Sequence, residues 1–459
     1  MSWSIEAKAF FTHPVIIVLL ALFVIGIVLM ILGVTGVISA SEVRISPSLP
    51  VIPTVSLCTE PLTLFQTLTP APDDNIIAQD LTPSGANWLL VQSQVGASTS
   101  CNYVLYKREP GAYTAAETLP NINDSVGGVA RLKYQALQAS VPQPTSGEGQ
   151  VRLYHRASTS AALFNTFNTL SPPIPGGSEY GVNTYFTGNN VTDTDEAFFV
   201  AQRVMPDGGH GALHIYEQVT TVPTLIQTLT APSPVAGDEF GARSYIQRNT
   251  WMVTSSPQEQ LIYAYYKPAD TKTWLESAAP FQSETPSETV ATDLWISTTG
   301  RVIIVGQADY PVATPGANQG RVEIFSRPDT NSNFTSSKVI TEPGGPVNNS
   351  RFGLSLTPDA DGFIFMLIPG HTSLPGVSPL LYIYRMHRKT FEVDDLPVET
   401  IEYGVSGPSP TVTGQFAQFV RASPDIPDDP LKTNDFIIAA SSQGTTSSVK
   451  LYLGCLALT

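Results

Sequence analysis

A short strand-like pattern that ends in an aromatic residue recurs seven times between Leu62 and Thr459. Successive copies lie roughly 50 to 70 residues apart, a spacing typical of the repeated sheets, or blades, of a β-propeller. We call the final aromatic of each copy the landmark aromatic, and we predict that it is partly or fully buried between neighbouring blades. The landmark aromatics are Tyr106, Tyr154, Tyr216, Tyr265, Phe325, Tyr384 and Tyr452.

Each copy belongs to a longer unit that contains four strand-like segments. Residues 302–306 (VIIVG) represent the apolar second segment, and residues 227–232 (QTLTAP) represent the fourth segment, which precedes the next unit. The alternation of apolar and polar residues, bounded by Gly and Pro, indicates strands rather than helices. Each unit therefore has the strand content of one propeller blade.

The two ends of the repeat region are incomplete in complementary ways. Residues 65–70 (FQTLTP) have the pattern of a fourth strand with no unit before them, whereas the unit that ends near Leu453 lacks a fourth strand. Pairing of residues 64–69 with residues 449–453 would supply that strand and remove two open sheet edges. The sequence therefore predicts an all-β fold, a closed seven-bladed β-propeller of four-stranded blades over residues 62–459. A pair of β-sandwiches and an open solenoid are the alternatives, and neither explains the displaced strand.

The junctions between units carry a second motif. Residues 227–241 run from a fourth strand into Phe240-Gly241, and Tyr180-Gly181 and Phe352-Gly353 occupy the same place in their units. This junction resembles that of FG-GAP repeats, the modules of integrin-α-type propellers. The resemblance covers the whole repeat region; it is good in the third, fourth and sixth units and poor in the first, fifth and seventh. It implies a propeller fold and, often, an extracellular or adhesive role, although the family is functionally mixed.

The resemblance also implies where a metal ion would bind. Many FG-GAP repeats hold calcium on an Asp-rich loop after the first strand, and calcium needs six or more oxygen ligands. The closest matches are Asp359 and Asp361, followed by Asp193 and Asp195. Neither loop has the family's downstream acidic residue, so a solvated turn is the alternative for both. No other cofactor is expected.

The N-terminal region differs from the repeats. Residues 14–38 are uncharged and strongly apolar, and at about 1.5 Å per residue such a run crosses a bilayer as a helix. We predict a short tail over residues 1–13, a transmembrane helix over residues 14–38 and a Pro-rich stalk over residues 39–61. A signal peptide cleaved after residues 38–40 is the alternative, but the apolar core of a signal peptide is usually shorter.

The orientation of this predicted span is weakly specified. Lys8 and Arg44 flank the apolar run on opposite sides, so the distribution of positive charge does not decide it. A short N-terminus followed by one span and a folded domain favours an extracytoplasmic propeller. Four sequons permit this placement without requiring it, at Asn123, Asn190, Asn333 and Asn348.

Charge and motif content exclude several classes of function. The formal net charge is −15, which disfavours nucleic acid and anionic lipid as partners. His210 and His214 have the spacing of a helical zinc pair, but they fall on a turn and a strand, where they would not face one another. We interpret Asp394-Asp395 and Asp428-Asp429 as solvated loop charges, because adjacent residues point apart. No nucleophile elbow is present, and we predict no catalytic residues.

The three cysteines, Cys58, Cys101 and Cys455, allow at most one internal disulfide. Antiparallel pairing of residues 64–69 with residues 449–453 would place Cys58 and Cys455 just beyond the same end of the strand pair. We predict a disulfide between them and a buried thiol at Cys101. Three reduced cysteines in a reducing compartment are the alternative.

Together these features favour a membrane-anchored, non-enzymatic interaction or structural protein that displays its propeller to a protein or glycan partner. An anchor, a stalk and degenerate repeats also fit a virion membrane protein of a large DNA virus. Two other functions stay open. A propeller hydrolase or lyase acting on glycans would need convergent carboxylates in a deep pocket, and a calcium-dependent adhesion receptor would need the Asp-rich loops.

Overall fold

The structure is a computed structural model, and the residues that it describes all fall within the unit Cys58–Leu458. The described residues are 63–69, 75–81, 87–95, 101–122, 130–132, 136–141, 148–155, 166–186, 197–206, 208–217, 223–241, 243–247, 249–282, 291–310, 318–348, 350–353, 357–358, 365–370, 380–387, 390, 392–402, 415–424, 435–443 and 448–455.

These residues form 28 strands and no helix, and the strands pair into seven four-stranded sheets. The first three sheets of consecutive strands are β2 (Asn75–Leu81), β3 (Trp88–Gln94), β4 (Cys101–Glu109) and β5 (Ala112–Ile122); β6 (Ala130–Leu132), β7 (Ala136–Val141), β8 (Gln150–His155) and β9 (Thr166–Leu170); and β10 (Ser178–Phe186), β11 (Ala197–Val204), β12 (Ala212–Glu217) and β13 (Thr224–Leu229).

Three further sheets of consecutive strands follow along the chain. They are β14 (Ser244–Gln247), β15 (Trp251–Ser256), β16 (Leu261–Tyr266) and β17 (Leu275–Glu276); β18 (Asp293–Ile296), β19 (Val302–Gln307), β20 (Arg321–Ser326) and β21 (Thr335–Ile340); and β22 (Thr357–Pro358), β23 (Phe365–Gly370), β24 (Leu380–Arg385) and β25 (Glu399–Glu402). The last sheet has the order β1 (Thr63–Leu68), β28 (Ser448–Cys455), β27 (Asp435–Gln443) and β26 (Gln415–Pro424).

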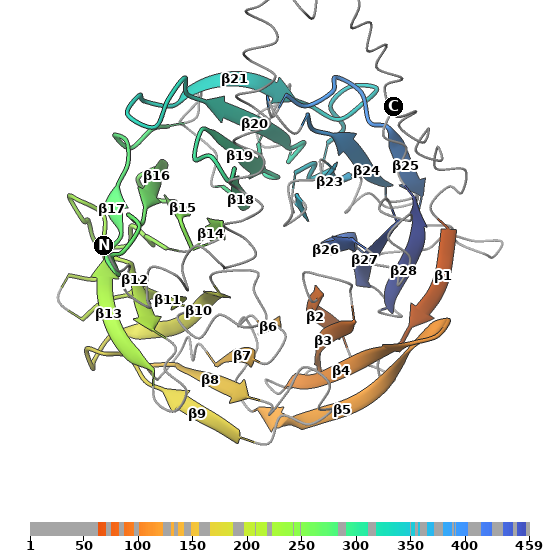
Figure 1. Cartoon of the computed structure of the whole chain (residues 1–459), viewed down its shortest axis with the longest axis horizontal. Helices are drawn as coiled ribbons and strands as arrows, with labels where there is room; N and C mark the ends of the chain where they lie inside the picture. The colour runs from red at the N-terminus through yellow and green to blue at the C-terminus, as the bar shows by residue number, and fades with distance from the viewer. Residues whose placement is uncertain are drawn as a thin grey trace, which may run out of the picture. The chain divides into compact units, whose positions relative to one another are not determined.

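The sheets follow one another around a ring (Figure 1). In the six sheets of consecutive strands the first strand is innermost and the fourth is outermost, and in the last sheet β26 is innermost and β1 is outermost. The innermost strands contact one another from β2 through β6, β10 and β14 to β18, and β22 contacts β26, which contacts β2 in turn. Second strands such as β19 are buried along their whole length, because they lie inside one sheet and between two others. This is the arrangement of a β-propeller, so the predicted all-β propeller fold is confirmed.

The first and last strands of the chain complete one sheet together. Strand β1 pairs antiparallel with β28, with Thr63 opposite Leu453 and Leu68 opposite Val449. The side chain of Leu68 packs in one cluster with Val449 and with Ile76 of the next sheet. The predicted pairing of residues 64–69 with residues 449–453 is therefore confirmed, and the orphan fourth strand at the start of the chain has its partner at the end.

The landmark aromatics lie where the repeat predicts. Tyr106 is half-buried, and the other six are buried: Tyr154, Tyr216, Tyr265, Phe325, Tyr384 and Tyr452. Two of them contact the aromatic residue that precedes their own sheet: Tyr265 stands edge-on to Phe240, and Tyr384 stands edge-on to Phe352. The prediction that the landmark aromatics are partly or fully buried is confirmed.

The aromatic-glycine motif forms a backbone contact between consecutive sheets. The N–H of Tyr180 donates to the carbonyl of Glu148 at 3.0 Å, and the N–H of Phe352 donates to that of Gln319 at 3.2 Å. Both acceptors precede a glycine, Gly149 or Gly320, on which a Cβ would clash with the aromatic residue's backbone. Because a side chain would separate the two chains, glycine is required where the sheets approach this closely.

A variant of the same contact joins the sheet of β10–β13 to the sheet of β14–β17. Here the Asp238 carboxylate Oδ1 accepts from the N–H of Gly211 at 2.6 Å and from the N–H of Phe240 at 3.0 Å. Gly241 follows with φ of 91°, a left-handed conformation that favours glycine. Gly181 and Gly353, with φ of 89° and 90°, are in the same state, so the three motifs are structurally equivalent.

A glutamine of the fourth strand links two sheets at their outer edge. The side-chain amide of Gln66 on β1 donates to the carbonyl of Tyr113 at 2.9 Å and accepts from its N–H at 2.6 Å. The amide of Gln227 on β13 makes the same pair of hydrogen bonds to Trp274, at 3.1 and 2.8 Å. We call this arrangement the glutamine clamp. It gives a specific role to the QTL sequence that marks fourth strands.

Several sequence predictions lie outside the described residues. They include the span over residues 14–38, Cys58, Asn123, Asn190 and the four aspartates proposed for calcium. Within the described part of the chain, no helix has the length and apolarity to cross a membrane. Cys101 is a buried thiol, as predicted. The disulfide from Cys58 to Cys455 stays a prediction.

We expect Gln66→Ala to lower the free energy of unfolding by about 1 to 3 kcal/mol, because both backbone groups of the buried Tyr113 lose their clamp partner. The adjacent Thr67→Ala, at an exposed position, should change it by less than about 0.5 kcal/mol. Denaturant unfolding of the full chain measures both values. Equal stabilities for the two variants would show that the clamp contributes nothing.

Candidate functional site

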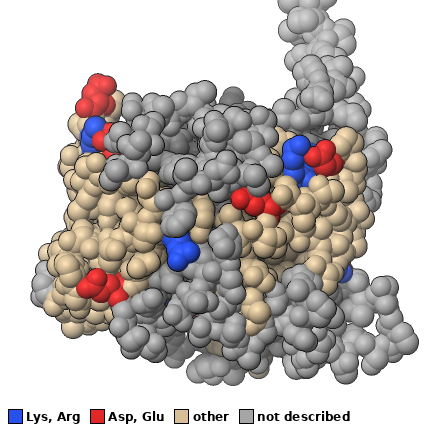
Figure 2. Space-filling view, turned by 90° about the horizontal axis from the view of Figure 1, so that it is seen from below, with Lys and Arg blue, Asp and Glu red and all other residues tan. Residues whose placement is uncertain are grey.

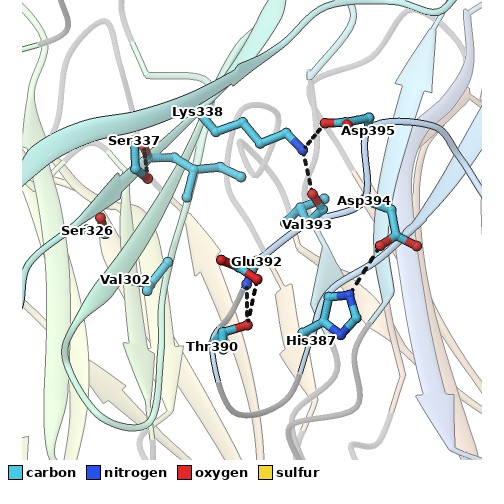
Figure 3. Close-up of a pocket in the computed structure, with 11 residues that line it drawn as sticks. Val302, Ser326, Ser337, Lys338, His387, Thr390, Glu392, Val393, Asp394 and Asp395 are labelled. Carbon is cyan, nitrogen blue, oxygen red and sulfur yellow. Dashed lines mark hydrogen bonds and ion pairs between the residues drawn. The ribbon is translucent and has the colours of Figure 1, made fainter.

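A cavity of about 540 Å³ lies between the sheet of β18–β21 and the sheet of β22–β25. Strands β19, β20 and β21 contribute one wall, and the loop after β24 contributes the other (Figure 3). The lining is mostly polar and consists of Val302, Ile324, Ser326, Ser337, Lys338, His387, Thr390, Glu392, Val393, Asp394 and Asp395. Its size falls within the usual range of small-molecule pockets.

The loop after β24 is held in shape by its own backbone. The N–H of His387 donates to the carbonyl of Glu392 at 2.7 Å, and the N–H of Asp394 donates to that of Arg385 at 3.0 Å. Val393 is buried in the apolar core between them. The loop therefore folds back along the end of β24, and this conformation places Glu392, Asp394 and Asp395 on the wall of the cavity.

Lys338 bridges the two walls of the cavity. Its ammonium donates to the carbonyl of Val393 at 2.5 Å and to Asp395 Oδ1 at 2.6 Å (Figure 3). Lys338 stands two residues before the buried Ile340, as Gln66 stands two residues before Leu68. It thus occupies the clamp position, but an ammonium group donates and cannot accept. The amide of the glutamine clamp both donates and accepts a hydrogen bond, whereas Lys338 only donates one to a carbonyl and forms an ion pair.

Asp394 and Asp395 point to different partners. Asp394 accepts from Arg385 Nε at 2.9 Å and lies 3.3 Å from His387 Nε2, whereas Asp395 pairs with Lys338. The hydrogen bond from Lys338 lowers the pKa of Asp395 below its usual range. The expectation that the two side chains diverge is confirmed. The interpretation of Asp394 as a solvated charge is wrong, because its side chain is only 23% exposed and is bound by two neighbours.

Two hydroxyl groups of the lining are engaged by oxygen atoms close to them. The Ser337 hydroxyl donates to the carbonyl of Ile324 at 2.9 Å, so the contact seen for it does not activate a nucleophile. The Thr390 hydroxyl donates to Glu392 at 3.3 Å. What the lining offers is a set of hydroxyls, carboxylates and one ammonium group, which can exchange hydrogen bonds with a polar ligand.

No metal site forms among the described residues, since they contain no group of three His, Cys, Asp or Glu side chains placed to hold an ion. The ring nitrogens of His214 lie 3.0 Å from Thr228 Oγ1 and 3.0 Å from Gln202 Oε1. Both ring nitrogens of His214 are thus within hydrogen-bond distance of other side chains.

His214 belongs to a buried polar network inside the sheet of β10–β13. Its ring lies 5.7 Å from that of Tyr180, whose hydroxyl donates to the hydroxyl of Tyr216 at 2.8 Å. Burial lowers the pKa of His214 from 6.5 to about 4, because the charged imidazolium loses its hydration. This role was not predicted, because the sequence does not show whether the side chain of a histidine in a strand points into the core or toward solvent.

On the face shown in Figure 2, the acidic and basic residues that the structure describes form small separate groups among uncharged described residues. The expectation that nucleic acid is not a partner stays a prediction.

The buried His214 should make stability depend on pH. Its folded-state pKa, about 4, lies below its ordinary value of 6.5, so the unfolded chain binds the proton more readily. The contribution of the neutral His214 to the free energy of unfolding is therefore fully present above about pH 6.5. It is lost as the pH falls to about 4, and the loss amounts to about 3 kcal/mol. We expect the difference in unfolding free energy between pH 7 and pH 4 to be smaller by about this amount in His214→Gln. An equal pH dependence in both proteins would contradict this.

No protein-family model and no curated protein matches the chain. Solved structures with a similar fold include a protein from Lactobacillus plantarum, at 11% identity and a TM-score of 0.48 over 72% of this chain and 86% of that one. Chaetomium thermophilum Sqt1 has 11% identity and a TM-score of 0.46 over 84% and 86%. The Pseudomonas aeruginosa periplasmic gluconolactonase PpgL has 12% identity and a TM-score of 0.46 over 71% and 85%. Similarities at this level assign neither a ligand nor an activity to this chain.

Proposed function

We propose that the protein is a membrane-anchored, non-enzymatic binding protein whose propeller holds a polar group of a protein or glycan partner in the cavity beside Lys338. The observation that carries the proposal is the cavity itself, about 540 Å³ in volume and lined by groups that donate and accept hydrogen bonds. Its charges are largely neutralised in pairs, so a ligand would meet oriented dipoles rather than an exposed catalytic acid and base.

The wider architecture of the proposal has three parts. The seven sheets are the blades of one closed seven-bladed propeller, related to the FG-GAP repeat proteins. Residues 14–38 are the transmembrane anchor, supported by an uncharged apolar run of the required length. The Pro-rich residues 39–61 form a stalk, and the propeller lies on the extracytoplasmic side of the membrane.

One experiment tests the function and the anchor together. The full chain, reconstituted in liposomes, is floated after alkaline extraction and is then exposed to immobilised panels of glycans and peptides. We expect the protein to float with the vesicles, to bind a defined subset of the panel and to leave the bound molecules chemically unchanged. Ser326→Phe, which fills the cavity, should abolish that binding, whereas Thr224→Phe at an exposed position of β13 should not.

Each readout can fail separately. Release from the vesicles by alkali would remove the anchor from the proposal. Binding that survives Ser326→Phe while the protein melts normally would place the partner elsewhere. Appearance of cleaved or eliminated glycan products would favour the hydrolase or lyase function instead.

A further inference from the structure

Asn333 stands out among the described side chains of the loop between β20 and β21. It is exposed, and no described residue forms a hydrogen bond or an ion pair with its side chain. The preceding turn is fixed by Asp329, which accepts from the N–H of Asn331 at 2.9 Å and from the Ser332 hydroxyl at 3.0 Å. Thr335, the third residue of the sequon Asn333-Phe334-Thr335, is exposed as well.

The residue between them holds the sequon in place. Phe334 is buried, its ring lies 5.1 Å from that of Phe281, and the Arg327 guanidinium stands 4.3 Å from its centre. Because successive side chains of an extended chain point to opposite sides, the buried Phe334 places the residues on either side of it at the surface. The same alternation occurs at Thr273 before Trp274. Asn333 is therefore presented to solvent by the repeat geometry rather than by a loose loop.

The other described sequon begins at Asn348. It differs from the first in the asparagine amide and in the sequon hydroxyl, the two groups that glycosylation requires. The Asn348 carbonyl Oδ1 accepts from Gln319 Nε2 at 2.7 Å, and the sequon hydroxyl at Ser350 belongs to a residue that is fully buried. At Asn333 both the amide and the sequon hydroxyl are on the surface. A glycan is bulky and hydrophilic and needs an exposed attachment point.

We propose that Asn333 is N-glycosylated, an inference that rests on the extracytoplasmic placement of the propeller proposed above. The co-substrate is an oligosaccharide linked to a polyprenyl diphosphate. A bond forms between Asn333 Nδ2 and the anomeric carbon of the sugar, the bond from that carbon to the diphosphate oxygen breaks, and the lipid diphosphate leaves with the bonding pair while Nδ2 loses one proton. The glycan would stand on the outer rim of the β18–β21 sheet.

The test uses the full chain, expressed in cells that carry out N-glycosylation. Replacing Asn123, Asn190 and Asn348 by Gln leaves Asn333 as the single natural acceptor, and mass spectrometry of the peptide reports its occupancy. We expect glycan at Asn333, loss of it in Thr335→Ala and retention in Thr335→Ser. The matched reporter Thr271→Asn creates the sequon Asn-Lys-Thr in the exposed loop before Trp274 of the neighbouring sheet.

The possible outcomes distinguish failure of the proposed glycosylation site from failure of the proposed extracytoplasmic placement. An unmodified Asn333 beside a modified Thr271→Asn reporter overturns the proposed site and leaves the extracytoplasmic placement intact. An absence of glycan at both positions, with the propeller digested by protease added to the cytoplasmic side of sealed vesicles, overturns the site and the placement together. Absence at both positions with a protected propeller overturns the site alone.

Discussion

Direct hydrogen bonds between the backbones of consecutive sheets set how closely the sheets approach at two junctions of the ring. Apolar side chains can pack in many ways, but Tyr180 N–H to Glu148 O and Phe352 N–H to Gln319 O fix one spacing and one angle between neighbours. These bonds form only where a glycine lets the two chains meet. The glycine at the entrance of the third strand and the aromatic residue at the entrance of the next sheet therefore act as one unit, although about thirty residues separate them in sequence.

A second layer of contacts acts at the outer edge, where the fourth strand of one sheet meets the next sheet. The glutamine clamp satisfies an N–H and a carbonyl that would otherwise be buried without partners. Its two examples use β1 and β13. The first strand of the described chain, β1, therefore contacts the next sheet in the same way as β13, which lies in the middle of the chain. Where Lys338 takes the clamp position, the sheets still meet, but through one carbonyl and an ion pair. The cavity lies at this altered junction, which links the fold to the proposed binding function.

The repeat was predictable because each element of it is local in sequence. Alternation, the landmark aromatics and the QTL segments are visible without any knowledge of the fold, and the displaced QTL segment at residues 66–68 predicted the pairing of β1 with β28. The cavity was not predictable, because it forms where the loop after β24 meets Lys338 of the neighbouring sheet. The sequence does not show which residues of that loop face Lys338. Asp394 was misread for the same reason, since Arg385 and His387 become its partners only after the loop folds back along β24. Comparing Lys338-Val339-Ile340 with Gln66-Thr67-Leu68 is the one signal that could have drawn attention to Lys338.

A ring closed by its own terminal strand should unfold as a single cooperative structure, because β1 completes the sheet that the last strands of the chain begin and ties the two ends of the repeat region together. Native-state hydrogen exchange of the full chain tests this most directly. We expect the amides of β1 and β28 to open with free energies within about 1 kcal/mol of those in β19 and β20. Exchange of β1 amides at the rate of a frayed terminal segment, while β19 and β20 stay protected, would contradict closure of the ring by the N-terminal strand.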